Sequence, residues 1–454
     1  MMKISGKTEL LGLMGNPVRH TMSPEIHNTL SEELGRDMVY VAFPVEEDPV
    51  EAVRGAYHLG IRGMNVTVPH KLGVIPALVE IDPAAEAIGA VNTLVRVDGG
   101  YKGYNTDMPG LGRSLRTKGV TLEGKQVVVL GAGGASRAVC VLALTERAES
   151  VYLINRTKEK AQALAEDLLA HFPEGKMIPL SKEEYQLVPE KPTVMIQCTS
   201  LGLHEGDGLL IEDRAFYKKA IYGYDLVYNP AVTPFLKLLR EMGIPGDNGL
   251  SMLLYQGVIA YELWTGETIG EDLVQRVRMK LERRLYGENV LLVGYMGCGK
   301  STVGRKLAEE QGMDFLDMDA LIEQEMGCTI RKIFEERGEA GFRELETACL
   351  RKLRDTAVHT VIATGGGAVL RKENRELMKD AGQVIWLQAS EKTTFDRVKS
   401  DRNRPLLDAG GEEALRQKIH TMLETRRASY DAAADRVVTV DGKTVEMIAA
   451  EISK

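Results

Sequence analysis

A strand, a glycine turn and the start of a helix follow one another in Gln126-Val-Val-Val-Leu-Gly131-Ala132-Gly133-Gly134-Ala135-Ser136. The β-branched run predicts a buried strand, and glycines without Cβ atoms let a backbone approach a pyrophosphate held at a helix N-terminus. The stretch departs from the G-x-G-x-x-G pattern because Ser136 occupies its last position. A tight turn without a ligand would use the same glycines. The stretch therefore predicts a Rossmann-type unit, whose ligand must be inferred from the residues around it.

The next predicted strand, Val151–Ile154, ends in Asn155-Arg156-Thr157. Folds that bind NAD usually carry an acidic residue at this point, which holds the ribose 2′-hydroxyl. That acid is absent here, and Arg156 can pair with a 2′-phosphate through its guanidinium fork. We therefore expect NADP rather than NAD. The alternative is an arginine that is only solvated at the surface.

A second strand–loop–helix unit is Gly294-Tyr-Met-Gly297-Cys298-Gly299-Lys300-Ser301, between the predicted strand Asn289–Val293 and the predicted helix Thr302–Gln311. It matches the P-loop pattern G-x-x-x-x-G-K-[ST] in the context that the pattern requires. In such loops backbone N–H groups surround nucleotide phosphates, the lysine neutralises β- and γ-phosphate oxygens, and the serine binds Mg²⁺. We therefore expect ATP and Mg²⁺. The predicted ATP-binding residues of the loop are Gly297, Cys298, Gly299, Lys300, Ser301 and Thr302.

Two carboxylates on alternate residues, Asp317 and Asp319, follow the next apolar run. One could hold Mg²⁺ through water while the other faces an acceptor alcohol, and a helix N-cap with a surface acid is the open alternative. Residues 288–454 are few for a motor or a transport ATPase, and they lack the guanine-specificity motif Asn-Lys-x-Asp. The pattern favours a small-molecule kinase.

Strands and helices alternate along all 454 residues, which predicts α/β architecture with largely parallel sheets. The net charge of −8 argues against a nucleic-acid binder, and the scattered cysteines argue against zinc or disulfides. No apolar run is long enough for a membrane helix, and no signal-peptide pattern opens the chain, so we expect a cytoplasmic protein. A charged helical pattern, Glu271–Tyr286, places a boundary near residues 286–288.

Residues 1–286 resemble the shikimate dehydrogenase family along their whole length. The resemblance rests on several separate motifs in the right order, namely Gly15-Asn-Pro-Val-Arg-His20-Thr21-Met-Ser23-Pro24, Asn65-Val-Thr67-Val-Pro-His70-Lys71, Gly89-Ala-Val-Asn92-Thr93, Tyr104-Asn105-Thr106-Asp107, Tyr224-Asp225, Thr233-Pro234-Phe235 and Asn248-Gly249-Leu250 through Gln256. It implies an α/β substrate-binding domain at 1–107, a Rossmann NADP-binding domain at 108–247, and C-terminal helices with the junction at 248–287.

The same resemblance implies that Lys71 is the general acid/base and that Asp107 lies beside it. A lysine suits this role because its ammonium can protonate the alkoxide formed as NADPH delivers hydride. His70 is assigned no role. The implied substrate-binding residues are Thr21, Ser23, Thr67, Asn92, Asp107, Tyr228 and Gln256. The implied NADP-binding residues are Gly131, Ala132, Gly133, Gly134, Ala135, Asn155, Arg156, Thr157, Lys160, Leu226 and Gly249.

Two of these positions depart from the family pattern. Thr21 stands where many relatives have Ser, which keeps the hydroxyl, and Leu226 stands where some have Met, which keeps an apolar side chain. We expect both exchanges to be mild.

Residues 288–454 resemble the shikimate kinase family, which implies a P-loop α/β domain with a parallel sheet. Besides the P-loop and the acidic pair, the resemblance rests on Gly341-Phe342-Arg343-Glu344, Thr364-Gly365-Gly366-Gly367, Arg404-Pro405-Leu406-Leu407 and Arg426 through Tyr430. It implies catalytic roles for Lys300 and Asp319, with Asp319 as the base, and a role in Mg²⁺ binding for Ser301 and Asp317. The implied shikimate-binding residues are Asp319, Arg343, Gly366 and Arg426.

Two assignments in this half of the chain leave an alternative open. Arg404, an implied ATP-binding residue, lies in the charged segment Asp396–Gly411, which we interpret as a mobile lid over the transferred phosphate rather than a solvated loop. The register at Arg426 is open to Arg427, because relatives commonly have Pro before the tyrosine and this chain does not.

Together the resemblances imply reduction of 3-dehydroshikimate to shikimate with NADPH, then phosphorylation of shikimate to shikimate 3-phosphate with ATP. A rival pairs a quinate dehydrogenase with a sugar-acid kinase, and the Asn155-Arg156-Thr157 and Phe342-Arg343 motifs count against it. A second rival is a catalytically dead scaffold, against which the retained catalytic residues argue. The expected partners are these small substrates, without nucleic acid or membrane, and an oligomer is left open.

Overall fold

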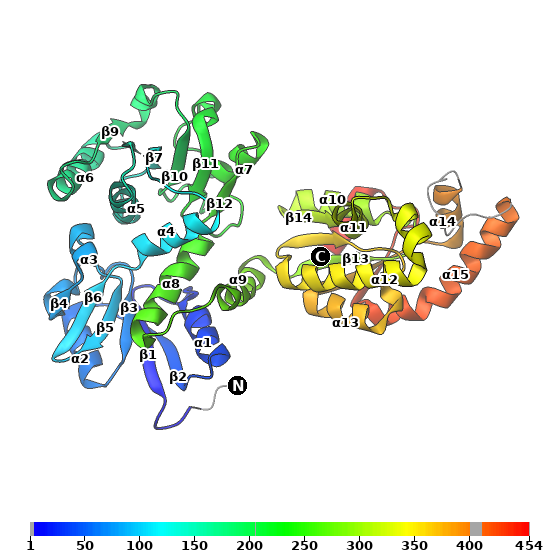
Figure 1. Ribbon diagram of the computed structural model, residues 1–454, viewed down its shortest axis with the longest axis horizontal. Coiled ribbons are helices and arrows are strands. Elements are labelled where there is room, and N and C mark those ends of the chain that lie inside the picture. The colour runs from blue at the N-terminus through cyan, green and yellow to red at the C-terminus, as the bar shows by residue number, and fades with distance from the viewer. Residues whose placement is uncertain (1–3, 205, 400–410, 454) are drawn as a thin grey trace. The chain divides into compact units, whose positions relative to one another are not determined.

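A computed structural model describes residues 4–204, 206–399 and 411–453. The chain divides into two units, unit 1 (Met1–Leu281) and unit 2 (Glu282–Lys454). The division falls within helix α9 (Glu271–Tyr286). Unit 1 has two sheets and unit 2 has one, as Figure 1 shows, and each unit has its own core clusters. The predicted α/β fold class is confirmed.

The first sheet of unit 1 has six strands in the order β2-β1-β3-β5-β6-β4. The strands β1, β2 and β3 are parallel, whereas β5 runs antiparallel to β3 and β6. The sheet is mixed because a tight turn with Gly99 at φ +83° returns the chain directly from β5 to β6. Its elements are β1 (Glu9–Gly15), α1 (Ser23–Glu33), β2 (Met38–Pro44), α2 (Pro49–His58), β3 (Gly63–Val66), the 3₁₀ helix η1 (Ile75–Ala77), β4 (Glu80–Ile81), α3 (Pro83–Ile88), β5 (Thr93–Val97) and β6 (Gly100–Tyr104).

The second sheet of unit 1 is parallel throughout, in the order β12-β11-β10-β7-β8-β9. Val127 and Val129 of β7 pack in the core that α5 and α6 cover, and Val128 and Leu130 pack in the core that α7 covers. The β-branched run is therefore buried on both faces. The elements are α4 (Asp107–Thr117), β7 (Gln126–Leu130), α5 (Gly134–Thr145), β8 (Ser150–Asn155), α6 (Lys158–His171), β9 (Met177–Ser181), η2 (Lys182–Leu187), β10 (Thr193–Gln197), η3 (Arg214–Lys219), β11 (Ala220–Asp225), α7 (Pro234–Glu241), β12 (Gly246–Asn248) and α8 (Leu250–Thr265).

Helices α4 and α8 pack against each other and lie between the two sheets of unit 1 in Figure 1. They approach closely because Gly110 of α4 has no Cβ, and one built there would lie 2.8 Å from the backbone N of Gln256. At the other end of α8, the Trp264 indole Nε1 donates to Leu94 O at 2.9 Å. Helix α8 is thereby fixed to both α4 and the first sheet.

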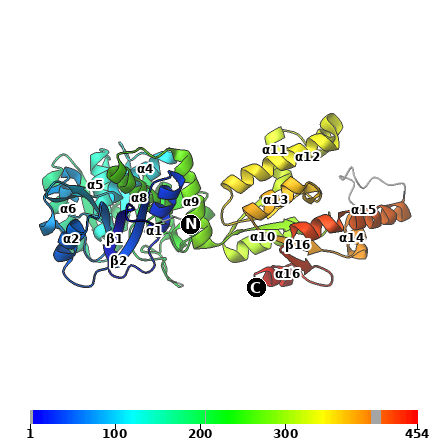
Figure 2. The same cartoon turned by 90° about the horizontal axis from the view of Figure 1, so that it is seen from below.

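Unit 2 has one parallel sheet in the order β14-β15-β13-β16-β17. Val384 and Trp386 of β16 pack in the core formed with α12 and α13, whereas Ile385 and Leu387 pack in the core formed with α10 and α16. Figure 2 shows α13 and α16 on opposite sides of β16. The elements are β13 (Asn289–Val293), α10 (Lys300–Gln311), β14 (Asp314–Asp317), α11 (Met318–Met326), α12 (Ile330–Thr356), β15 (Thr360–Ala363), η4 (Ala368–Leu370), α13 (Lys372–Ala381), β16 (Gly382–Gln388), α14 (Glu391–Val398), α15 (Glu412–Ala433), β17 (Arg436–Thr439) and α16 (Val445–Ile452).

In the part of the chain that the structure describes, every helix is too short or too polar to cross a bilayer.

We predict that Gly63→Ala destabilises unit 1. A Cβ at Gly63 would overlap the indole nitrogen of Trp264, which is buried and rigid. Overpacking of this kind costs about 1–3 kcal/mol, so calorimetry should show a lower unfolding transition for unit 1. The matched control is Gly55→Ala in α2, where a Cβ meets nothing within 4 Å and should stabilise the helix by up to about 1 kcal/mol. Equal transitions for the two variants would contradict the packing of α8 on β3.

Candidate active sites

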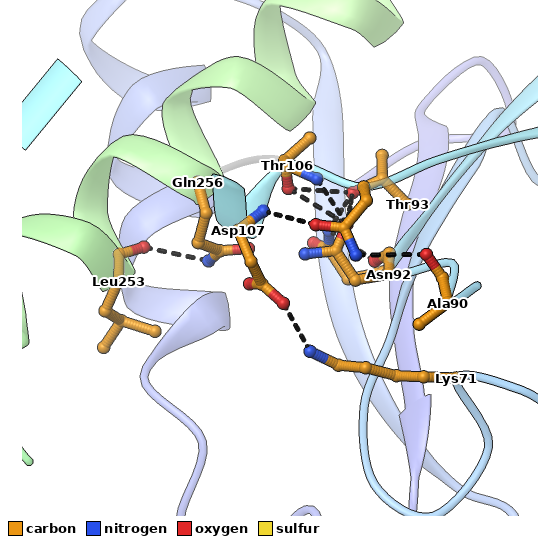
Figure 3. Close-up of polar contacts among 10 residues, drawn as sticks. Lys71, Ala90, Asn92, Thr93, Thr106, Asp107, Leu253 and Gln256 are labelled. Atoms are coloured by element: carbon orange, nitrogen blue, oxygen red, sulfur yellow. Dashed lines mark hydrogen bonds and ion pairs between the residues drawn. The ribbon is translucent and has the colours of Figure 1, made fainter. Parts of the chain in front are cut away.

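Lys71 and Asp107 form an ion pair in unit 1, with Lys71 Nζ 2.6 Å from Asp107 Oδ2 (Figure 3). Lys71 follows β3 after a turn closed by a hydrogen bond from His70 N to Thr67 O at 2.9 Å. Asp107 begins α4, where the helix dipole favours a carboxylate. The lysine side chain is 31% exposed and the aspartate side chain 20% exposed, so the pair is partly desolvated yet reachable. The two predicted catalytic residues of this half are therefore in contact.

The amide of Asn92 is fixed in orientation beside this pair (Figure 3). Its Oδ1 accepts a hydrogen bond from the backbone N of Thr106 at 2.8 Å and another from Thr93 Oγ1 at 3.0 Å. Because a backbone N–H can only donate, the oxygen of the amide must face Thr106, which directs Nδ2 the other way. Asn105 Oδ1 accepts from the backbone N of Asp107 at 3.1 Å. The two residues between β6 and α4, Asn105 and Thr106, thus hold Asp107 and Asn92 in one arrangement.

The other predicted substrate-binding residues come from three further parts of unit 1. Thr21 Oγ1 donates to Ser23 Oγ at 3.1 Å where α1 begins. Gln256 Nε2 donates to Leu253 O at 2.8 Å on α8, the helix that contacts α4 (Figure 3). Tyr228 lies after β11, and burial raises its pKa above the usual range.

The glycine turn after β7 leaves room for an anion. Gly131 adopts φ +109°, which favours glycine, and Cβ atoms built at Gly133 and Gly134 would meet nothing within 4 Å. Ser136 is fully buried, and its Oγ accepts a hydrogen bond from the backbone N of Gly133 at 3.1 Å. The departure from the glycine pattern therefore stabilises the turn. Exposed N–H groups at the start of α5 fit a dinucleotide pyrophosphate.

The turn after β8 and the first turn of α6 present two cations. Asn155 Nδ2 donates to Thr157 O at 2.8 Å, which fixes the turn. Arg156 and Lys160 are exposed, and neither side chain has a hydrogen-bond or ion-pair partner among residues 4–204, 206–399 and 411–453. Cations without a protein partner fit a ribose 2′-phosphate.

Asp225 is a fully buried carboxyl at the end of β11. Its Oδ1 accepts from the backbone N of Val227 at 3.0 Å, and its Oδ2 accepts from Thr233 Oγ1 at 2.6 Å. No cation in the described residues forms an ion pair with it, and burial raises its pKa to about 6. The adjacent Leu226 lies against Gly249, where a Cβ would overlap Leu226 O. Two predicted NADP-binding residues are thus brought together.

Unit 2 contains a cavity of about 970 Å³ beside the P-loop. Gly297 and Gly299 adopt φ +81° and +97°, which glycine tolerates, and a Cβ at Gly297 would lie 2.8 Å from Val398 Cγ1. The predicted residues that line the cavity are Gly297, Cys298, Gly299, Lys300, Ser301, Thr302, Asp317, Asp319, Arg343, Gly366 and Arg426. The remaining one, Arg404, and most of the predicted lid lie outside the described residues.

Asp317 caps a helix and also contacts the P-loop serine. Its Oδ1 accepts from the backbone N of Asp319 at 3.1 Å and so caps α11, while Ser301 Oγ donates to its Oδ2 at 2.6 Å. A serine hydroxyl and a carboxylate in contact are hard oxygen donors, which fit Mg²⁺.

Arg343 is held between two carboxylates of its own helix. Its Nη1 lies 2.6 Å from Glu346 Oε2, and its Nη2 lies 2.8 Å from Glu339 Oε1. Glu346 is fully buried and lines the cavity, and burial raises its pKa against the opposing effect of Arg343. The motif comparison missed Glu346, although its spacing of three residues from Arg343 on a helix was a usable signal.

A second arginine faces the same cavity from α15. Arg426 is 7% exposed and donates to Gly366 O at 3.3 Å, whereas Arg427 is exposed and does not line the cavity. The register with Arg426 at the cavity is therefore the one that the structure has. Sequence reasoning missed Arg397, whose Nη1 donates to Gly297 O at 3.1 Å. Nothing distinguishes it in sequence from its charged, solvated neighbours.

We predict that Asp225 makes the stability of unit 1 fall as pH rises. Its folded-state pKa of about 6 lies above the usual range, so the stabilising contribution of the neutral form is complete at low pH and is lost through pH 6. The free energy of unfolding of wild type, relative to Asp225→Asn, should fall by up to about 3 kcal/mol between about pH 4 and pH 7. Urea unfolding over that range measures it, and a difference independent of pH would contradict the burial of an unpaired carboxyl.

Family models match both units. In unit 1, the shikimate dehydrogenase substrate binding domain matches residues 13–94, shikimate/quinate 5-dehydrogenase matches 114–200, and the shikimate 5'-dehydrogenase C-terminal domain matches 249–277. In unit 2, shikimate kinase matches residues 296–454. Both resemblances inferred from the motifs are confirmed.

Known proteins similar to unit 1 support this result. The shikimate dehydrogenase (NADP(+)) of Caldanaerobacter subterraneus subsp. tengcongensis is 44% identical over 274 residues, which cover 60% of this chain and 97% of the relative. The shikimate 5-dehydrogenase of Listeria monocytogenes, solved in complex with shikimate and NAD, is 32% identical with a TM-score of 0.56, covering 61% of this chain and 98% of its own. A chorismate mutase/shikimate 5-dehydrogenase fusion protein from Clostridium acetobutylicum is 34% identical with a TM-score of 0.55, covering 61% of this chain and 98% of its own.

The chain therefore belongs to the shikimate dehydrogenase family in unit 1 and to the shikimate kinase family in unit 2, which makes it a bifunctional enzyme of the shikimate pathway.

Proposed function

We propose that unit 1 reduces 3-dehydroshikimate to shikimate with NADPH and that unit 2 phosphorylates shikimate to shikimate 3-phosphate with Mg-ATP. The observation that carries the reductase proposal is the contact between Lys71 and Asp107 beside the fixed amide of Asn92. The kinase proposal rests on a single cavity that collects the P-loop, the acidic pair and two arginines. The product of the first reaction is then the substrate of the second.

In the reductase, Lys71 supplies the proton that the reaction needs. Bound NADPH supplies a hydride to the carbonyl carbon. The ammonium of Lys71, held by Asp107 at 2.6 Å, then protonates the oxygen that becomes the hydroxyl. In the reverse direction the neutral amine removes this proton. Asn92 has its oxygen occupied, so it contacts the substrate through Nδ2 as a donor.

The substrate carboxylate and remaining hydroxyls are assigned to hydroxyl and amide groups around this pair. The residues are Thr21, Ser23, Thr67, Tyr228 and Gln256. We assign NADP to the glycine turn, to Arg156 and Lys160, and to the contact of Leu226 with Gly249. The NADP(+) specificity named for the Caldanaerobacter relative supports this assignment. The substrate-binding domain is assigned to 1–107, the NADP domain to 108–247, and the helices and junction to 248–287.

In the kinase, charged groups surround the acceptor and the transferred phosphoryl group. Lys300 Nζ, which lies 2.8 Å from Gly294 O, is placed on the P-loop to neutralise phosphate oxygens. Asp319 accepts the proton of the attacking shikimate hydroxyl. Arg343 and Arg426 bind the shikimate carboxylate, which guanidinium groups hold in bidentate fashion.

Two of the alternatives weighed from the sequence now have less support. A sugar-acid kinase does not agree with the shikimate kinase match over residues 296–454. A dead scaffold does not agree with a formed Lys71–Asp107 pair and a formed P-loop cavity. Quinate, which the family description names beside shikimate, is the substrate to test against it. A cytoplasmic location is part of the proposal, because the cysteines are unpaired, as in reducing compartments.

Substitution of the two lysines should separate the activities. Lys71→Ala should lower the turnover of 3-dehydroshikimate by about 10²–10⁴ because the proton donor is lost, with NADPH affinity nearly unchanged. Lys300→Ala is the matched variant, which should abolish phosphorylation and leave reduction intact. Absorbance at the NADPH band and a coupled ADP assay measure the two rates on one preparation. Near-normal reduction by Lys71→Ala would remove this lysine from the mechanism.

Arg343→Ala should raise the KM for shikimate far more than the KM for ATP. Loss of a charge-assisted bond to the carboxylate is worth about 1.5–3 kcal/mol, or roughly 10- to 100-fold in KM. The matched control is Arg351→Ala on the same helix, an exposed arginine outside the cavity. Steady-state kinetics of the kinase reaction give both constants. An equal rise in the KM for shikimate and the KM for ATP would contradict the assignment of Arg343 to the carboxylate.

A further inference from the structure

The loop between β11 and α7 begins and ends at one buried carboxylate. Asp225 accepts from the backbone N of Val227 at the start of the loop and from the hydroxyl of Thr233 at its end. Thr233 is itself buried, and its Oγ1 also accepts from the backbone N of Leu236 at 3.3 Å, which caps α7. The carboxylate therefore joins the end of a strand, both ends of a loop and the start of a helix.

We propose that Asp225 and Thr233 are positioning residues of the dehydrogenase, which clamp the loop of residues 226–233 so that Leu226 and Tyr228 are held at the reaction site. The proposal rests on the function proposed above, which assigns Leu226 to NADP and Tyr228 to the substrate. Neither Asp225 nor Thr233 contacts substrate in this account; both act through the loop.

Folding alone does not explain a charged group here. Burial of a carboxylate without a cation is strongly unfavourable, and in this site it raises the pKa of Asp225 to about 6. An asparagine could make the same two contacts, with its oxygen accepting from Val227 and its nitrogen donating to Thr233. The carboxylate adds a shorter, charge-assisted bond to the Thr233 hydroxyl, at 2.6 Å, and so fixes the direction of that hydroxyl.

Other hydrogen bonds hold the loop on both sides of Tyr228, among them one from Gly249 N to Val227 O at 3.2 Å. Leu226 N donates to Gln197 O at 2.9 Å, and Asn248 Nδ2 donates to Ala231 O at 3.0 Å. These bonds hold the backbone on either side of Tyr228, whereas the loop end at Thr233 is held by the Asp225 side chain. Because Thr233 and Val227 bind the same carboxylate, loss of the clamp is expected to release the end of the loop at Thr233 and to shift the backbone at Val227, next to Tyr228.

Shikimate oxidation by the full chain with NADP⁺ tests the clamp. Thr233→Val removes the hydroxyl at nearly constant volume and should raise the KM for shikimate by roughly 3- to 10-fold. Thr233→Ser keeps the hydroxyl and should stay within about twofold of wild type. Thr444→Val is the matched control, because Thr444 caps α16 of unit 2 in the same way. A purely structural role would lower the thermal transition of Thr233→Val without moving the KM, and that result would overturn the proposal.

A double-mutant cycle with Tyr228→Phe shows whether the clamp acts through the loop. If it does, the double variant Thr233→Val/Tyr228→Phe should have a KM close to that of the worse single variant, because both remove the same interaction. If instead the increase in KM of the double variant equals the product of the increases of the two single variants, the clamp does not act through Tyr228.

Hydrogen exchange separates a failure of this inference from a failure of the proposed function. The Val227 amide, protected by Asp225, should exchange faster in Thr233→Val than in wild type, whatever the substrate is. Inactive wild type with this faster exchange would leave the clamp standing and remove the substrate assignment. Unchanged exchange would remove the clamp.

Discussion

Both halves of this enzyme depend on one constraint, which is that a parallel strand, a glycine turn and a helix must present backbone N–H groups to an anion. In unit 1 the turn after β7 relies on Gly131 at φ +109°, and in unit 2 the P-loop relies on Gly297 and Gly299 at φ +81° and +97°. Parallel order places the carboxyl ends of all these strands at the same edge, so further polar residues arrive at the edge that carries each turn. Asp225 at the end of β11 and Asp317 at the end of β14 are the examples, each separated by one strand from the strand that carries the turn.

The proposed catalytic groups of unit 1 are placed by packing as much as by hydrogen bonds. Lys71 and Asp107 come from different elements, and the absence of a Cβ at Gly110 lets α8 lie close enough to α4 to carry Gln256 beside them. The clamp that we propose would come at a cost in stability. The buried, unpaired Asp225 opposes folding at neutral pH, which is the pattern expected where a site is held in shape at a cost to the fold.

The sequence predicted the fold class and most of the residues that line the kinase cavity, because motifs such as the P-loop determine the local backbone geometry directly. It could not predict the roles of residues that depend on burial in the folded chain. Ser136 departs from the glycine pattern, yet in the structure its hydroxyl accepts a hydrogen bond that stabilises the turn. In the sequence nothing distinguishes Arg397 from a solvated cation, yet its side chain donates to the P-loop. In the sequence nothing distinguishes Glu346 and Asp225 from exposed acidic residues, because their complete burial arises only from the fold.

The most direct test of the central claim, that one chain catalyses two consecutive reactions, is product identification by mass spectrometry. The pure chain is mixed with 3-dehydroshikimate, NADPH and Mg-ATP, and each nucleotide is omitted in turn. The account predicts shikimate without ATP, shikimate 3-phosphate with both nucleotides, and neither product without NADPH. If both nucleotides bind and neither product forms, the substrates and the site assignments are wrong together.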